Sequence, residues 1–191
     1  EALIGEHLDH KNVVNVYKSG CANGLFYILM ELCEGGSVDD LIKKHGGRLP
    51  LELATYIIIQ VLNGLDYAHQ ADVKVKLGFW KRDAQGVVHR DFKPANIFLS
   101  DSSHRPVAKV ADFGLAKAFE TAGLSGNTRT GTVAGTPVFM PRQQIINFKY
   151  AKPDVDVWAA AASYYFMLTG EIPKEFKGGD IWMAMLNGRA I

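Results

Sequence analysis

The sequence has few cysteines and no long uncharged apolar run, and each absence excludes a class of protein. Cys21 and Cys33 are the only cysteines among 191 residues, too few for a disulfide framework or a four-cysteine zinc site. The longest nearly uncharged apolar run, Val157–Leu168, has 12 residues, whereas a membrane-spanning helix needs about 20. We therefore expect a reducing, cytoplasmic location, a buried core helix at 157–168, and a membrane anchor only if the parent protein carries one outside this portion.

An excess of charge of one sign is also missing. Lysine and arginine number 21 against 20 acidic residues, which gives a formal net charge of +1. This balance argues against a generally basic nucleic-acid binder, and no nucleic-acid partner is expected. Because no repeat or linker-like tract interrupts the chain, we expect one compact piece that buries about 70% of its unfolded surface.

Apolar patterning predicts that strands come early in the chain and that helices dominate later. The apolar run Leu25–Leu32 and the preceding Val13–Tyr17 are typical of an antiparallel pair. Helical spacing predicts helices at Ser37–Lys44 and at Leu51–His69, the second long enough to be central and buried. Short strands are expected at 96–99 and 107–111.

The segment Ala71–Gln85 alternates Val, Val and Leu with Lys and then turns at Gly78, which predicts a loop or a short hairpin between larger elements. Its four basic residues favour a solvated face. A docking or nucleic-acid patch is the alternative, but no second basic cluster accompanies the segment.

Two polar motifs follow. Val88–Leu99 has the sequence VHRDFKPANIFL, and Val107–Lys117 has the sequence VAKVADFGLAK. They place four polar side chains at the ends of short strands: Asp91, Lys93, Asn96 and Asp112. The amide and carboxylate oxygens of Asn96 and Asp112 suit Mg²⁺, which completes its shell with water and substrate phosphates. Asp91 is then left to accept a hydroxyl proton while Lys93 screens charge, so the pattern indicates phosphoryl transfer.

HRDFKPAN, followed 21 residues after Asp91 by DFG, resembles the signature of a eukaryotic-type Ser/Thr protein kinase catalytic domain. The resemblance implies a two-lobed α+β kinase fold, truncated at both ends. Residues 1–32 would be part of the N-lobe, from helix C to the hinge, and residues 33–191 the C-lobe without its final helices. It also implies that ATP and Mg²⁺ are used to phosphorylate protein Ser and Thr hydroxyls. Asp91 would be the catalytic base, Lys93 the lysine typical of Ser/Thr kinases, and Asn96 and Asp112 the metal ligands.

By the same resemblance, residues on both sides of the hinge would bind the nucleotide. Glu1 would pair with the ATP-binding lysine of the family. Met30 would be the gatekeeper, and the hinge backbone of Glu31 and Cys33 would hold the adenine. Ser37 near the ribose and Phe98 complete the expected cofactor-binding set.

The sequence GTPVFMPRQ at 135–143 resembles the end of a kinase activation segment, and Asp156 would brace the catalytic loop. Thr136 would face the acceptor residue. Arg90 marks kinases that are controlled by phosphorylation, because an isolated arginine near the site favours an anionic partner. Thr132 fits the primary phosphorylation site best, with Thr128 and Thr130 as alternatives and Lys117 as a second phosphate ligand.

The sequence also departs from the family pattern. In this family the Gly-rich phosphate loop and the ATP-binding lysine precede the Glu1 position, and the sequence as given does not contain them. The last helical pattern runs to Ile191 without a stop signal. We therefore expect both ends to continue into a longer protein. Gly5 replaces a bulky residue of helix C. Pro141-Arg142-Gln143 replaces Ala-Pro-Glu, so a neutral hydrogen bond is expected in place of a buried ion pair. This variant resembles bacterial Ser/Thr kinases.

Two other functions are compatible with parts of this pattern. A pseudokinase or scaffold fragment would bind partners without transferring phosphate, and the missing lysine is what would support it. A small-molecule kinase of the aminoglycoside or choline type also has an HxDxxxxN pattern. It would lack the long DFG-to-GTP segment and the lysine that follows Asp91 by two residues.

Overall fold

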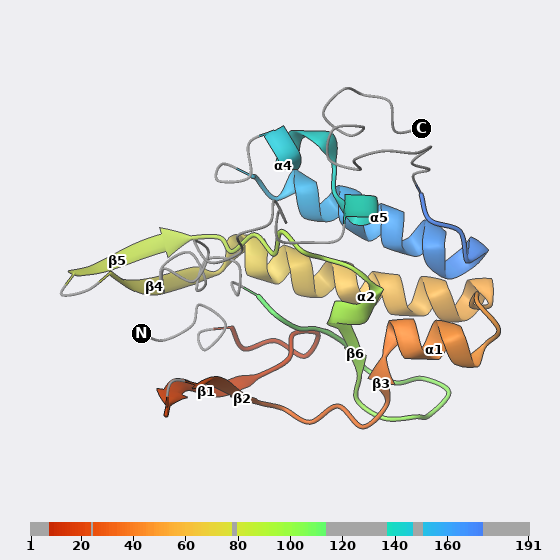
Figure 1. Ribbon diagram of the computed structural model, residues 1–191, viewed down its shortest axis with the longest axis horizontal. Helices are drawn as coiled ribbons and strands as arrows, with labels where there is room; N and C mark the ends of the chain where they lie inside the picture. The colour runs from red at the N-terminus through yellow and green to blue at the C-terminus, as the bar shows by residue number, and fades with distance from the viewer. Residues whose placement is uncertain (1–7, 24, 78–79, 114–136, 147–150, 174–191) are drawn as a thin grey trace.

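The computed structural model describes residues 8–23, 25–77, 80–113, 137–146 and 151–173. Two long helices lie side by side, and small β-structures flank them (Figure 1). The described elements, in chain order, are β1 Val16–Ala22, β2 Leu25–Met30, β3 Gly36–Ser37, α1 Val38–Lys44, α2 Leu51–Gln70, β4 Asp72–Leu77, β5 Trp80–Gln85, the 3-10 turn η2 Pro94–Asn96, β6 Ile97–Leu99, β7 Ala108–Val110, the 3-10 turn η4 Pro137–Phe139, α4 Arg142–Ile146 and α5 Asp154–Thr169.

The predicted antiparallel pair forms, but its first strand lies later in the chain than expected. β1 pairs antiparallel with β2, from Val16 opposite Met30 to Ala22 opposite Leu25. Asn23 has a φ of 52°, which is typical of a tight hairpin turn, so the chain reverses direction directly after Ala22. The first strand therefore extends to Ala22. Val13, which was expected in this strand, instead forms a parallel bridge with Val110.

The three predicted helices are confirmed with small changes of limits. Ser37 caps α1: its hydroxyl accepts from the Asp40 amide at 3.1 Å while the Asp40 carboxylate accepts from the Ser37 amide at 3.2 Å. α2 has 20 residues and buries one face. α5 covers the apolar run at 157–168 and ends at Gly170, whose φ of 75° is a left-handed helix cap.

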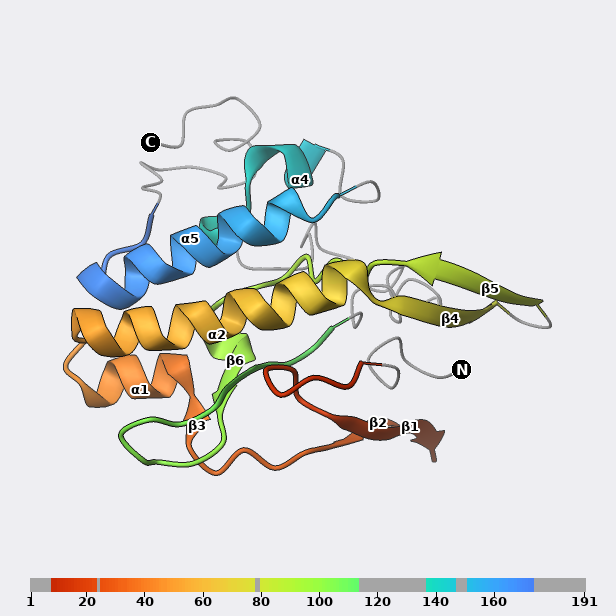
Figure 2. The same cartoon turned by 180° about the vertical axis from the view of Figure 1, so that it is seen from behind.

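The core lies between α2, α5 and the sheet of β3, β6 and β7 (Figure 2). Ile57 and Val61 of α2 are fully buried, and burying such a side chain stabilises the fold by about 1.5–3 kcal/mol. Gly64 lets α2 approach the chain near Asn12, because a Cβ atom there would lie 2.5 Å from the Asn12 carbonyl oxygen. None of the helices that the structure describes is long and apolar enough to cross a membrane.

β4 and β5 form the predicted hairpin, which projects from the end of α2 (Figures 1 and 2). Its base is fixed to the helix by the Gly86 amide, which donates to the Ala71 carbonyl at 2.9 Å, and by the Val87 amide, which donates to the Ala68 carbonyl at 2.8 Å. Gly86 has a φ of 78°, and a Cβ atom there would lie 2.6 Å from the His69 carbonyl. The chain therefore returns from the hairpin directly into the segment that carries Asp91.

Candidate active site

A buried carboxylate fixes the start of the loop that carries Asp91. Asp156, near the start of α5, is 1% exposed. It accepts from the His89 amide at 2.8 Å, from the Arg90 amide at 2.9 Å and from His69 Nε2 at 2.8 Å. Three donors compensate the burial of this charge. Arg90 is held with a φ of 68°, a strained conformation for a residue with a side chain, at a cost of about 1–3 kcal/mol.

His89 links this loop to the segment before Asp112. Its Nε2 atom lies 2.7 Å from the Ala111 carbonyl, which can only accept, and its Nδ1 atom accepts from the Asp91 amide at 3.3 Å. The proton of the neutral ring is therefore on Nε2. The ring also packs on Phe113, with centroids 4.9 Å apart. Gly5, which replaces a bulky residue of helix C, lies outside the described residues.

The turn η2 brings together Asp91, Lys93 and Asn96. Lys93 Nζ donates to Asp91 Oδ2 at 2.8 Å. Asn96 Nδ2 donates to the Asp91 carbonyl at 2.8 Å, and Asn96 is 8% exposed. Because its nitrogen is committed to that carbonyl, the oxygen of the Asn96 amide is the end that can bind a cation.

Asp112 follows β7 and lies beside the same loop. The Ala111 amide donates to the Asn96 carbonyl at 2.9 Å, and Asp112 itself has a φ of 65°. Burial is the main cause that raises the pKa of the Asp112 carboxyl, and the negative charge of Asp91 also raises it. The charges of His89 and Lys93 lower the pKa. A partly desolvated carboxylate at Asp112 and an amide oxygen at Asn96, on segments joined by the hydrogen bond from Ala111 to Asn96, are a donor set that fits Mg²⁺.

A family model described as "Protein kinase domain" matches residues 1–187. The chain belongs to the protein kinase family. It is 33% identical to serine/threonine-protein kinase atg1 of Dictyostelium discoideum over 90% of this chain and 23% of that protein. It is 33% identical to PknL of Mycobacterium tuberculosis over 91% of this chain and 38% of that kinase, and 32% identical to PknJ of the same species over 91% and 26%. The chain therefore spans well under half the length of these relatives.

The expected nucleotide residues of the kinase domain lie on β2, on the segment after it, and on the small sheet. Met30 ends β2 and is half-buried. Glu31 follows it, and its amide donates to the Asn15 carbonyl at 2.8 Å. Burial, followed by the charge of Glu31, raises the pKa of the Cys33 thiol. The boundary between lobes at residues 32 and 33 stays a prediction.

Ser37 and Phe98 are brought together, since they are directly opposed in the pairing of β3 with β6. The Ser37 hydroxyl, expected near the ribose, already donates to Asp40 Oδ2 at 2.6 Å and caps α1. Its role toward the nucleotide stays a prediction. The remaining predicted site residues lie outside the described residues: Glu1, Lys117, Thr128, Thr130, Thr132 and Thr136.

Two residues that sequence reasoning did not select make specific contacts near the site. Gln144 of α4 is 1% exposed, and its Nε2 atom donates to the Arg90 carbonyl. Gln143, at the position where the family has a buried glutamate, is exposed. The neutral hydrogen bond expected in place of the family's ion pair stays a prediction. Lys109 of β7 forms an ion pair with Glu31 at 2.9 Å.

Proposed function

We propose that this kinase domain transfers the γ-phosphoryl group of ATP to Ser and Thr hydroxyls of proteins. The observation that supports this most is the pairing of Lys93 Nζ with Asp91 Oδ2 at 2.8 Å. A carboxylate beside a lysine can accept a hydroxyl proton while positive charge stays near the transferred group. The relatives described as serine/threonine-protein kinases support the same acceptor class.

In this proposal Asp91 takes the proton of the acceptor hydroxyl as its oxygen bonds to the γ-phosphorus, and the bond from that phosphorus to the β–γ bridging oxygen breaks to release ADP. Lys93 stabilises negative charge on the transferred group. Asn96 and Asp112 would hold Mg²⁺, which, when bound, supplies positive charge to the phosphate oxygens. The hinge backbone at Glu31 and Cys33, with Phe98 beneath, would bind the adenine.

Regulation by phosphorylation belongs to the same proposal. Arg90, next to the base, and Lys117 would bind a phosphate on the activation segment, with Thr132 as its first site and Thr128 or Thr130 as alternatives. Thr136 would recognise the acceptor residue, and Glu1 would position the ATP-binding lysine of the family. We propose protein substrates, no nucleic-acid partner and a cytoplasmic location.

The test is phosphoryl transfer by the full-length protein from γ-labelled ATP to an acceptor protein such as casein, with and without EDTA. Label on Ser and Thr that disappears with EDTA, together with label on Thr132 of the kinase itself, is expected. ATP binding without transfer would favour the scaffold alternative, and transfer only to small hydroxyl compounds would favour a small-molecule kinase. Self-modification confined to Ser125 would refute the assignment of Thr132.

A further inference from the structure

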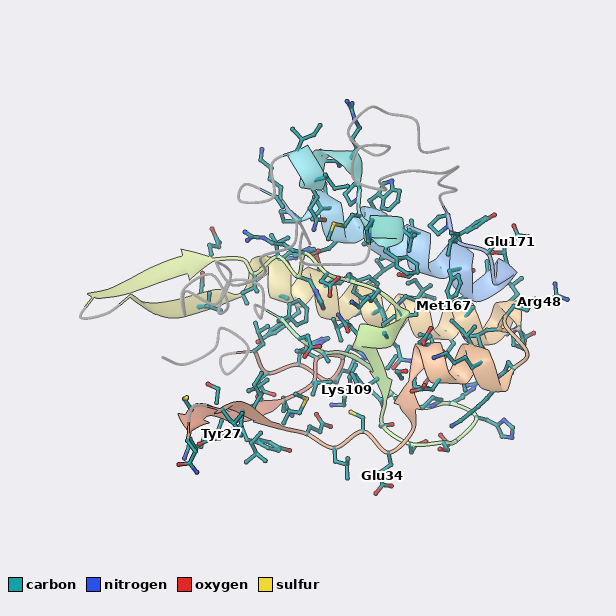
Figure 3. All side chains as sticks on the ribbon, in the orientation of Figure 1. Tyr27, Glu34, Arg48, Lys109, Met167 and Glu171 are labelled. Carbon is teal, nitrogen blue, oxygen red and sulfur yellow. The ribbon has the colours of Figure 1, made fainter. Side chains whose placement is uncertain are left out.

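Lys109 lies in one row with two residues of the expected nucleotide site. It is directly opposite Phe98 in the pairing of β6 with β7, and Phe98 is opposite Ser37 in the pairing of β3 with β6. Directly opposed residues of antiparallel strands share a face of the sheet. Figure 3 shows Lys109 between the helical body and the segment that follows β2. Lys109 is thus next to Phe98, which is expected to contact the adenine. It also lies three residues before Asp112.

The Lys109 ammonium reaches across to the hinge. Its Nζ atom lies 2.9 Å from Glu31 Oε1 and 3.0 Å from Oε2, and the two side chains are only 11% and 23% exposed. Glu31 Oε2 also accepts from the Asn15 amide at 3.2 Å, while the Glu31 amide donates to the Asn15 carbonyl at 2.8 Å. The Glu31 peptide is therefore anchored through its main chain to the segment before β1 and through its carboxylate to β7.

β7 is itself fixed on its other side. The Val110 amide donates to the Asn12 carbonyl at 2.9 Å, and the Val14 amide donates to the Val110 carbonyl at 2.9 Å. Because these bonds hold β7 in place, the Lys109–Glu31 ion pair sets the position of the hinge relative to β7 and to Phe98. An ion pair at this depth loses little to solvent screening compared with an exposed one.

We propose that the Lys109–Glu31 ion pair is a positioning device for ATP, and that it sets how tightly the hinge binds the purine. This inference rests on the proposed function, since it concerns the same nucleotide site. Neutralising Lys109 removes the cation from the Glu31 carboxylate and leaves it only the Asn15 amide, so the carboxylate turns toward water and moves the hinge peptide. Asp91 and Lys93, on a separate loop, keep their geometry.

The test compares Lys109→Met and Glu31→Gln with the charge-swapped double variant E31K/K109E in the full-length protein. Each single variant is expected to raise the KM for ATP, and the Kd of a fluorescent ATP analogue, about tenfold. The kcat and the KM for the acceptor protein stay within about twofold, and the double variant recovers most of the ATP affinity. The matched control is Lys43→Met, which breaks the exposed Lys43–Asp39 pair, 2.6 Å long, and leaves ATP affinity unchanged.

An unchanged affinity in Lys109→Met, or a loss of kcat at constant KM for ATP, would overturn the inference. A lower melting temperature without recovery in the double variant would also overturn it, because that result describes general stability and not positioning. These outcomes contradict the inference alone. A wild-type protein that binds no ATP contradicts the proposed function and, with it, this inference.

Discussion

The Gln144 side chain donates a hydrogen bond to the Arg90 carbonyl, and this bond helps to hold a peptide in a strained conformation. Asp156 holds the Arg90 amide, and Gln144 holds the carbonyl on the other side of the same residue. Arg90 directly precedes the proposed base Asp91. α4 is therefore connected, through one buried side-chain amide, to the loop that carries the proposed base.

Replacing Gln144 by Met keeps the side-chain volume and removes the donor. The Arg90 carbonyl then loses the hydrogen bond from Gln144, so Gln144→Met is expected to lower the free energy of unfolding by about 1–3 kcal/mol and to reduce phosphoryl transfer. Urea unfolding and kcat measure both effects. Gln143→Met, at the exposed neighbour, is the control and should change neither; equal effects at the two positions would contradict the assignment.

At this scale the sequence predicts residue types better than contacts. The motifs were sufficient to select Asp91, Lys93 and Asn96, which the structure brings together. Gln143 and Gln144 could not be distinguished, because burial depends on the rotational phase of a five-residue helix. The Lys109–Glu31 pair joins residues 78 positions apart, and no local pattern marks such a contact.

At the scale of elements, α1 depends on the capping box of Ser37 and Asp40. The hydrogen bond from the Ser37 hydroxyl is the main cause that lowers the pKa of the Asp40 carboxyl. A carboxyl whose pKa is lowered on folding contributes stability above its unfolded pKa, and that contribution is lost as pH falls through the lowered value.

Ser37→Ala is therefore expected to lower the Tm by about 2–4 °C at neutral pH, and the difference from wild type should narrow below the ordinary carboxyl pKa of 3.8. Differential scanning calorimetry across pH measures this. Ser37→Thr, which keeps the hydroxyl, and Ser102→Ala in an exposed loop are the controls. A Tm unchanged by Ser37→Ala would show that the cap contributes nothing.

The elements themselves were largely predictable, because their signals are local. Pro50 and the apolar spacing predict α2, and the alternation around Gly78 predicts the hairpin of β4 and β5. The limits of β1 were wrong because Val13 pairs with Val110, far along the chain, while the turn at Asn23 sets where the hairpin closes. Long-range pairing of this kind leaves no periodic trace in the sequence.

At the scale of the whole molecule, α2, α5 and the catalytic loop meet at Asp156. His69, near the end of α2, and the His89 and Arg90 amides all donate to this one carboxylate. The packing of the two long helices therefore determines where Asp91 lies. The α+β class and the kinase family could be predicted from motifs, whereas this junction required the folded chain.

The central claim is that Asp91 is the proton acceptor in phosphoryl transfer, and Asp91→Asn in the full-length protein tests it most directly. The change removes the base and keeps the side-chain shape, so kcat is expected to fall by about 10²–10⁴ while the Kd for ATP stays within about threefold. Asp101→Asn, at an exposed loop carboxylate, is the control and should leave kcat unchanged. A kcat for Asp91→Asn equal to that of wild type would contradict the account.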